Sequence, residues 1–165
     1  MTHWQVKRTL LIVGEGRDEK AFLMHIKQIF APRGCNLKVS IKQAGGKGAQ
    51  HVVDWTWRQA QNAAYDNVAV LLDTDTDWTD AVKKEARQRK IIVLTSDPRL
   101  EAMLLRIIGQ VPNGDARAMK KQFSTYVSGD ATRHENYAKH FDKDRLLGAA
   151  ASEQTIALML KLFNI

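Results

Sequence analysis

The sequence contains a single cysteine, Cys35, and five histidines that lack a metal-binding spacing such as HxxxH. One cysteine cannot close an intrachain disulfide, and it cannot by itself build a thiolate zinc site. No Ser/His/Asp or Cys/His set indicates nucleophilic catalysis, and no repeat or low-complexity tract is found. No apolar run approaches the roughly 20 residues that a membrane-spanning helix needs. We therefore expect a cytoplasmic protein without membrane contact.

The chain opens with MTHWQVKRTLLIVGEG, a basic stretch followed by an apolar run of only about five residues. This run leads directly to Glu15, whereas a signal peptide has a longer apolar core followed by small residues. The segment therefore predicts a first buried strand and not a signal peptide.

Lysine and arginine outnumber aspartate and glutamate by 25 to 18, which gives a formal net charge of +7. A basic surface attracts polyanions, and nucleic acid is the most common polyanionic partner of proteins. We therefore expect nucleic acid as a partner. The acidic residues that remain are concentrated in two short places, which points to a local function for them.

Short apolar segments alternate with amphipathic segments over most of the chain. The expected strands cover residues 9–16, 36–43, 67–73 and 90–96, and the expected helices cover 18–30, 49–64 and 78–89. The third strand, NVAVLLD, is almost continuously apolar, as a strand covered on both faces requires. Strands that alternate with helices predict parallel pairing through crossover helices. The predicted fold class is α/β, a Rossmann-like parallel four-stranded sheet with flanking helices.

Beyond Pro98 the pattern changes to helices alone. RLEAMLLRIIG at 99–109 predicts one helix, the polar stretch 110–136 contains weaker helices, and the chain ends in an amphipathic helix or a helix pair. No convincing linker divides the sequence. We expect one domain, in which residues 1–109 form an α/β core and residues 110–165 form a helical extension packed on that core.

Two groups of acidic residues lie where expected strands end. Asp73 ends the third strand, and Asp75 and Asp77 follow it at spacings of two. Glu15 ends the first strand between two glycines, and Glu19 lies in the first turn of the next helix. Ligands of open parallel sheets bind at the carboxyl ends of the strands. Carboxylates from two strand ends suit a hard cation, so the pattern predicts a site for Mg²⁺ or Mn²⁺.

Most of these acidic residues also have a purely structural explanation. Asp18 and Glu19 would interact favourably with the dipole at a helix N-terminus. Asp77 or a neighbour would cap the helix that starts near residue 79. Glu15 is harder to explain in this way, because a β-to-α turn normally has small or uncharged residues at that place.

Two further features have both a functional and a structural interpretation. The loop AGGKG at 44–48 would cradle a phosphate with help from Lys47, but it lacks the full P-loop spacing and is more often a plain turn. We name Gly16 and Lys47 as candidate cofactor-binding residues. Lys120 and Lys121 would face nucleic acid, or they would form a solvated helix face.

Three motifs in order resemble those of Toprim (topoisomerase–primase) domains. LLIVGEGRDEKAFL resembles the opening strand, Glu-Gly and helix of that family, and VAVLLDTDTD resembles its DxD strand. TSDPRLEAMLL is similar to a segment of the small bacterial Toprim proteins around the OLD-family nucleases and RloB-like proteins, with Asp97 replacing the usual asparagine and Glu101 at the glutamate. The resemblance covers residues 9–108. Gly14 departs from it, since a bulkier residue commonly precedes the glutamate.

The resemblance implies a Mg²⁺-dependent nuclease acting on DNA or RNA, in phage defence or nucleic-acid processing. Glu15 would act as general acid/base or metal ligand, Asp73 and Asp75 would hold Mg²⁺, and Glu19 would be a further ligand. Glu15, Asp73 and Asp75 are the expected catalytic residues. The expected metal ligands are Glu15, Glu19, Asp73, Asp75, Asp77 and Glu101, with the last two in a lesser role.

Other functions stay open at this point. A primase is disfavoured because the chain has no zinc-binding module, and a complete topoisomerase is excluded by size. The chain would alternatively be a metal-, nucleotide- or nucleic-acid-binding module that acts with a partner such as an ATPase, or as a homodimer. A Rossmann-like phosphatase with Asp73 as nucleophile is a third alternative, which leaves Glu15 unexplained.

Overall fold

Four parallel strands form the centre of the structure, a computed structural model that describes residues 7–165. The elements are β1 (Arg8–Gly14), α1 (Arg17–Phe30), β2 (Leu37–Gln43), α2 (Gly48–Ala60), β3 (Asn67–Asp73), α3 (Asp80–Gln88), β4 (Ile91–Ser96), α4 (Leu100–Ile107), α5 (Ala116–Ser124), the short 3₁₀ helix η1 (His134–Tyr137), α6 (Lys143–Ala149) and α7 (Gln154–Leu162). The α/β fold class and the parallel four-stranded sheet are confirmed. Residues 1–6, which begin the expected core and its basic opening stretch, lie outside the described residues.

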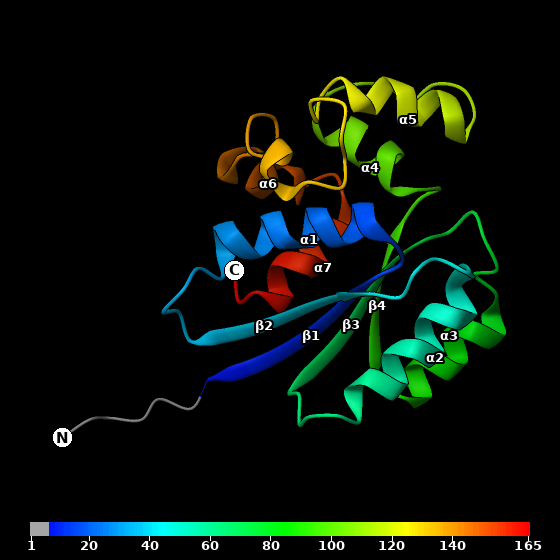
Figure 1. Cartoon of the computed structure of the whole chain (residues 1–165), viewed down its shortest axis with the longest axis vertical. Coiled ribbons are helices and arrows are strands. Elements are labelled where there is room, and N and C mark those ends of the chain that lie inside the picture. The colour runs from blue at the N-terminus through cyan, green and yellow to red at the C-terminus, as the bar shows by residue number, and fades with distance from the viewer. Residues whose placement is uncertain (1–6) are drawn as a thin grey trace.

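The sheet is covered by helices on both faces. Along β1, Leu10 and Ile12 pack in the core cluster that contains α1, whereas Leu11 and Val13 pack in the cluster that contains α2. All four of these side chains are fully buried. Figure 1 shows α1 on one side of the sheet and α2 and α3 on the other. The continuous apolar runs of the central strands therefore follow from burial on both faces.

The turn from β1 into α1 is very short, because only Glu15 and Gly16 separate the two elements. A Cβ on Gly14 would lie 2.8 Å from the Cβ of Glu19 and 2.9 Å from the backbone nitrogen of Lys20. The first turn of α1 thus occupies the space that a side chain at position 14 would need. This close approach is the physical reason for glycine at position 14.

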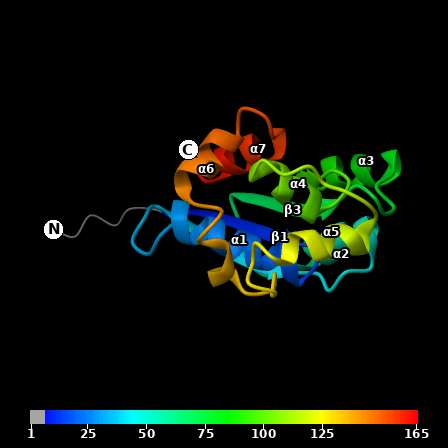
Figure 2. The same cartoon turned by 90° about the horizontal axis from the view of Figure 1, so that it is seen from above.

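The helices after β4 pack against α1 and extend its core. Tyr137 and Phe141 are fully buried and lie beside Phe22 of α1, with ring centroids 5.9 Å and 6.3 Å from it, and the buried Phe123 packs against both. Figure 2, which views the molecule from above, shows α4 to α7 placed around α1. The chain end is a pair of helices, α6 and α7, with a break at 150–153. Within residues 7–165, no helix combines the length and apolar character that crossing a membrane requires.

The strand order β2-β1-β3-β4 creates one switch point in the sheet. From β1 the chain runs through α1 to β2 on one side, and from β3 it runs through α3 to β4 on the other. The carboxyl ends of β1 and β3 therefore lie side by side where the connections diverge. Open α/β sheets bind their ligands at this place.

Candidate metal centre

Three carboxylates meet at the switch point between β1 and β3. Glu15 follows β1, Asp73 ends β3, and Glu19 lies in the first turn of α1. One oxygen from each of the three lies within 4.8 Å of the others. Glu15 and Glu19 from one of the acidic groups predicted from the sequence thus lie next to Asp73 from the other.

Backbone N–H groups hold one oxygen of each carboxylate. Glu15 Oε2 accepts a hydrogen bond from the N–H of Asp73 (3.0 Å), and Glu19 Oε2 accepts one from Gly16 (3.0 Å). Asp73 Oδ1 accepts from the N–H of Leu100 at the start of α4 (2.9 Å). Among the described residues, no hydrogen bond reaches the second oxygen of any of the three. The backbone therefore orients each carboxylate and leaves one oxygen for a ligand.

The three carboxylates are costly to ionise together. Burial, followed by the charges of Glu15 and Asp18, raises the pKa of Glu19 to about 7. Burial and the neighbouring charges of Glu19 and Glu15 raise the pKa of Asp73 to about 8. Burial also raises the pKa of Glu15, against the hydrogen bond from Asp73. A bound divalent cation would remove this repulsion, which makes the cluster suited to one.

A cavity of about 650 Å³ opens beside the cluster. Among the residues that line it are the acidic side chains of Glu19, Asp73 and Glu101 and the basic side chains of Arg17, Arg99 and Lys120. The carboxylates would accommodate a metal ion, and the basic side chains around them would accommodate an anionic group in the same cavity.

Glu101 and Asp18 also lie in this cavity, outside the three-carboxylate cluster. Glu101 is in the first turn of α4 and is only 5% exposed. Burial raises its pKa, while Lys120 acts in the opposite direction. Burial also raises the pKa of Asp18, a residue that sequence reasoning explained by the helix dipole alone. The structure therefore adds Asp18 to the acidic residues around the cavity.

Asp75 pairs with an arginine and is not part of the three-carboxylate cluster. The chain bends directly after Asp73, so the extended-chain argument for two parallel side chains does not hold. Arg99 Nη2 lies 2.5 Å from Asp75 Oδ2, and Arg99 Nε is buried without a hydrogen-bond partner in the described residues. Asp75 thus lies outside the cluster, and its expected role as a metal ligand stays a prediction. Sequence reasoning missed Arg99, whose only signal was its place in the TSDPRLE segment.

Asp77 caps a helix that is distant in sequence. Its carboxylate accepts hydrogen bonds from the N–H groups of Ala49 (2.6 Å) and Gln50 (3.3 Å), at the start of α2. Slight burial would raise its pKa, but these hydrogen bonds outweigh it and the pKa is lowered. The helix that follows Asp77 is capped by Thr79 instead. Asp77 is therefore neither in the metal cluster nor the cap of α3, and Gly48, where a Cβ would lie 2.5 Å from Asp77 Oδ1, makes room for it.

The two candidate cofactor-binding residues have different surroundings. Gly16 lines the cavity, but its N–H is already bonded to Glu19. Lys47 is the left-handed residue before α2, with φ 69°. Of the loop at 44–48, Gly45 and Gly46 line the cavity and Lys47 does not.

The donor atoms available at the cluster are carboxylate oxygens, the ligands that Mg²⁺ and Mn²⁺ prefer. Cys35, the sole cysteine, lies in a different hollow beyond the end of α1. No family model matches this chain, and neither a curated protein nor a solved structure matches it. The chemistry of the site is therefore inferred from its own residues.

Proposed function

We propose that this chain is a divalent-cation-dependent nuclease that hydrolyses phosphodiester bonds in DNA or RNA. The observation that carries the proposal is the cluster of Glu15, Glu19 and Asp73, each with one oxygen left for a ligand at the switch point of the sheet. The resemblance to Toprim domains depends on the same residues and supports the same chemistry. A role in phage defence or nucleic-acid processing depends on that resemblance alone.

Glu15, Glu19 and Asp73 would hold Mg²⁺ or Mn²⁺. Such an ion would polarise the scissile phosphate and lower the pKa of a bound water. In the alternative role of general acid/base, Glu15 would take the proton of that water on its free oxygen in place of binding the ion. Its backbone hydrogen bond from Asp73 keeps the carboxylate in one orientation for this transfer.

Arg99 and Lys120 would bind the phosphate group. Both line the cavity beside the carboxylates, and the Arg99 guanidinium is held in place by Asp75. A planar guanidinium can donate two hydrogen bonds to one phosphate, which orients it as well as neutralising it.

The test is cleavage by the purified chain of supercoiled plasmid, single-stranded DNA and structured RNA in Mg²⁺, Mn²⁺ or EDTA. Glu15→Gln and Asp73→Asn keep the shape of each side chain and remove its charge. Asp80→Asn is the matched control, since Asp80 is fully exposed at the start of α3. We expect cleavage that requires the metal, is lost in the two cluster variants and is unchanged in the control.

Cleavage that persists in EDTA, or that survives both cluster substitutions, would contradict the proposal. Absence of cleavage with metal binding still measurable by calorimetry would contradict an autonomous nuclease and favour a module that acts with a partner protein. Turnover of p-nitrophenyl phosphate with a covalent phospho-aspartate would instead identify Asp73 as the nucleophile of a phosphatase.

A further inference from the structure

Two further hollows continue from the metal-site cavity along α1. The first, of about 200 Å³, adjoins the cavity through Arg17, Gln43 and Thr132. The second, of about 500 Å³, adjoins the first through Lys20 and Met24. Together they form one depression between α1 and the edge strand β2, which we call the α1–β2 groove. It is lined by the cations Arg17, Lys20, Lys27 and Arg33 and by the apolar side chains of Met24 and Ile41.

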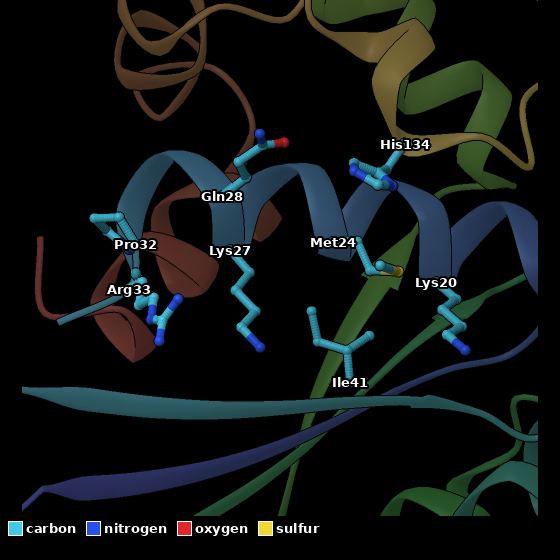
Figure 3. Close-up of a pocket in the computed structure, with 9 residues that line it drawn as sticks. Lys20, Met24, Lys27, Gln28, Pro32, Arg33, Ile41 and His134 are labelled. Carbon is cyan, nitrogen blue, oxygen red and sulfur yellow. The ribbon is translucent and has the colours of Figure 1, made fainter. Parts of the chain in front are cut away.

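The groove combines cations with an apolar surface. Figure 3 shows Lys20, Met24 and Lys27 reaching from α1 toward β2, with Ile41 reaching from β2 toward α1 between them. Arg33 closes the far end, beyond the C-terminus of α1. The positive groups therefore follow the length of the helix, and apolar side chains lie between them.

The cations of the groove form no ion pair with a carboxylate of the described residues, although Asp18 and Asp130 lie near Arg17. Within residues 7–165, Arg17, Lys20, Lys27 and Arg33 form no salt bridge, whereas three other arginines of the chain pair with aspartate or glutamate. A row of cations such as Lys20, Lys27 and Arg33 produces a potential that attracts a polyanion. The row begins at Arg17, which also lines the metal-site cavity, so a polyanion bound along it would reach that cavity.

We propose that the α1–β2 groove binds a single-stranded segment of nucleic acid and directs it to Glu15, Glu19 and Asp73; this inference rests on the proposed nuclease function. A duplex presents phosphates outward and keeps its base faces stacked inside, so it would not use Met24 and Ile41. An unpaired strand exposes its bases to apolar surface while its phosphates contact lysine and arginine. The 14 residues of α1 span about 20 Å, enough for several nucleotides.

The test is binding of fluorescent oligonucleotides of about 12 nucleotides, within the range of known single-strand sites, measured by anisotropy in EDTA. Single-stranded DNA, single-stranded RNA and duplex DNA of the same sequence are compared. The double variant Lys20→Ala/Lys27→Ala removes two groove cations. Lys83→Ala/Lys84→Ala is the matched control, because it removes the same charge from α3 on the opposite face of the sheet.

We expect the chain to bind at least one single strand more tightly than duplex. The groove variant should weaken single-strand binding about tenfold and reduce the slope of log K against log salt by about 1.4, from two phosphate contacts at about 0.7 each. The control should change neither. Tighter binding of either single-stranded DNA or single-stranded RNA supports the proposal, and comparing the two identifies the preferred nucleic acid.

A third variant, Met24→Ser, tests contact with the bases. It should weaken single-strand binding without changing the salt slope, because it removes apolar contact and no charge. The proposal would be overturned if the groove variant lost as much affinity for duplex as for single strands, or if the α3 control lost as much affinity as the groove variant. It would also be overturned if Met24→Ser left single-strand affinity unchanged. Binding in EDTA does not depend on cleavage, so binding in EDTA together with no cleavage in Mg²⁺ or Mn²⁺ would refute the nuclease and leave the groove proposal standing.

Discussion

The backbone N–H of Asp73 donates a hydrogen bond of 3.0 Å to the carboxylate of Glu15, 58 positions earlier in the chain. The donor is held by the sheet, in which Gly14 pairs with Leu71 in parallel register. The orientation of Glu15 is therefore set by strand pairing and does not depend on a neighbouring side chain. If Glu15 binds a cation as proposed, it is ordered before the ion arrives, which lowers the entropy cost of binding.

Replacing Glu15 by glutamine should separate metal binding from folding. The glutamine oxygen can still accept the Asp73 N–H, but the negative charge is lost. We expect the Mn²⁺ affinity, measured by calorimetry, to fall at least about tenfold, since losing even an outer-shell partner has an effect of that size. Glu15→Ala should also lower the free energy of unfolding by about 1 kcal/mol through the unpaired N–H. Unchanged Mn²⁺ affinity in the glutamine variant would remove Glu15 from the site.

The stability of the cation-free chain should depend on pH through Glu19 and Asp73. Their pKa values rise from 4.5 to about 7 and from 3.8 to about 8 on folding, so the folded state holds more protons than the unfolded state in that range. Their contribution to stability is therefore complete below about pH 4 and is lost as pH rises toward about pH 8. Mg²⁺ favours the ionised form and should raise the melting temperature more at high pH.

This pH dependence is checked by thermal unfolding at about pH 5.5 and about pH 8.5, with EDTA or with Mg²⁺. Glu19→Gln removes one of the two titrating groups and should flatten the dependence in EDTA. Asp80→Asn, at a fully exposed position, should leave it unchanged. An Mg²⁺-induced rise in melting temperature that is equal at both pH values would contradict the coupling of the carboxylates to the ion.

The fold was accessible from the sequence because its signals are local. The run NVAVLLD predicts a strand at 67–73, and β3 has those bounds. The run is apolar throughout because both faces of β3 are covered, and it ends where the chain leaves the sheet at Asp73. Alternating strand and helix patterns then require crossovers, which lead to parallel pairing.

The site was only partly accessible, because some of its contacts join distant segments. Glu15 and Asp73 could be placed together from the rule that ligands bind at strand ends. Asp75 was expected to point with Asp73, but the bend after β3 turns it toward Arg99. The hydrogen bond from Ala49 to Asp77 spans 28 positions, and no local pattern reveals it.

Asp77→Ala should lower stability without affecting metal binding. The substitution removes the acceptor for the N–H groups of Ala49 and Gln50 at the start of α2. Loss of such a helix cap costs about 1 kcal/mol, which urea unfolding can measure. The Mn²⁺ affinity should be unchanged. A large loss of Mn²⁺ affinity with unaltered stability would return Asp77 to the ligand set that the sequence suggested.

Arg99→Lys should impair catalysis through substrate binding. Lysine keeps the positive charge but cannot engage Asp75 and a phosphate with one planar fork. We expect KM for the nucleic-acid substrate to rise about tenfold, the scale of one charge-assisted hydrogen bond, with a smaller change in kcat. Mn²⁺ affinity serves as the control, because Arg99 contributes no metal ligand. A loss confined to kcat would show that Arg99 acts on the transition state alone.

Gly14→Ala should destabilise the chain through a steric clash at the start of α1. The added Cβ would meet the Cβ of Glu19 at 2.8 Å and the backbone nitrogen of Lys20 at 2.9 Å. Neither atom is the end of a flexible side chain, so the helix itself has to shift. Overpacking of this kind costs about 1–3 kcal/mol, more than the 0.4–1 kcal/mol that alanine gains by restricting the unfolded chain.

Gly148→Ala in α6 is the matched control for this substitution. A Cβ at position 148 would meet nothing within 4 Å, so the change should raise the free energy of unfolding by about 0.5–1 kcal/mol, the helix preference for alanine. Urea unfolding should therefore show a lower free energy of unfolding for Gly14→Ala and a higher one for Gly148→Ala. Because the shift of α1 would also carry Glu19 away from Glu15, Gly14→Ala should weaken Mn²⁺ binding, whereas Gly148→Ala should not. A Gly14→Ala variant as stable as the unaltered chain would show that the first turn of α1 is not held against β1.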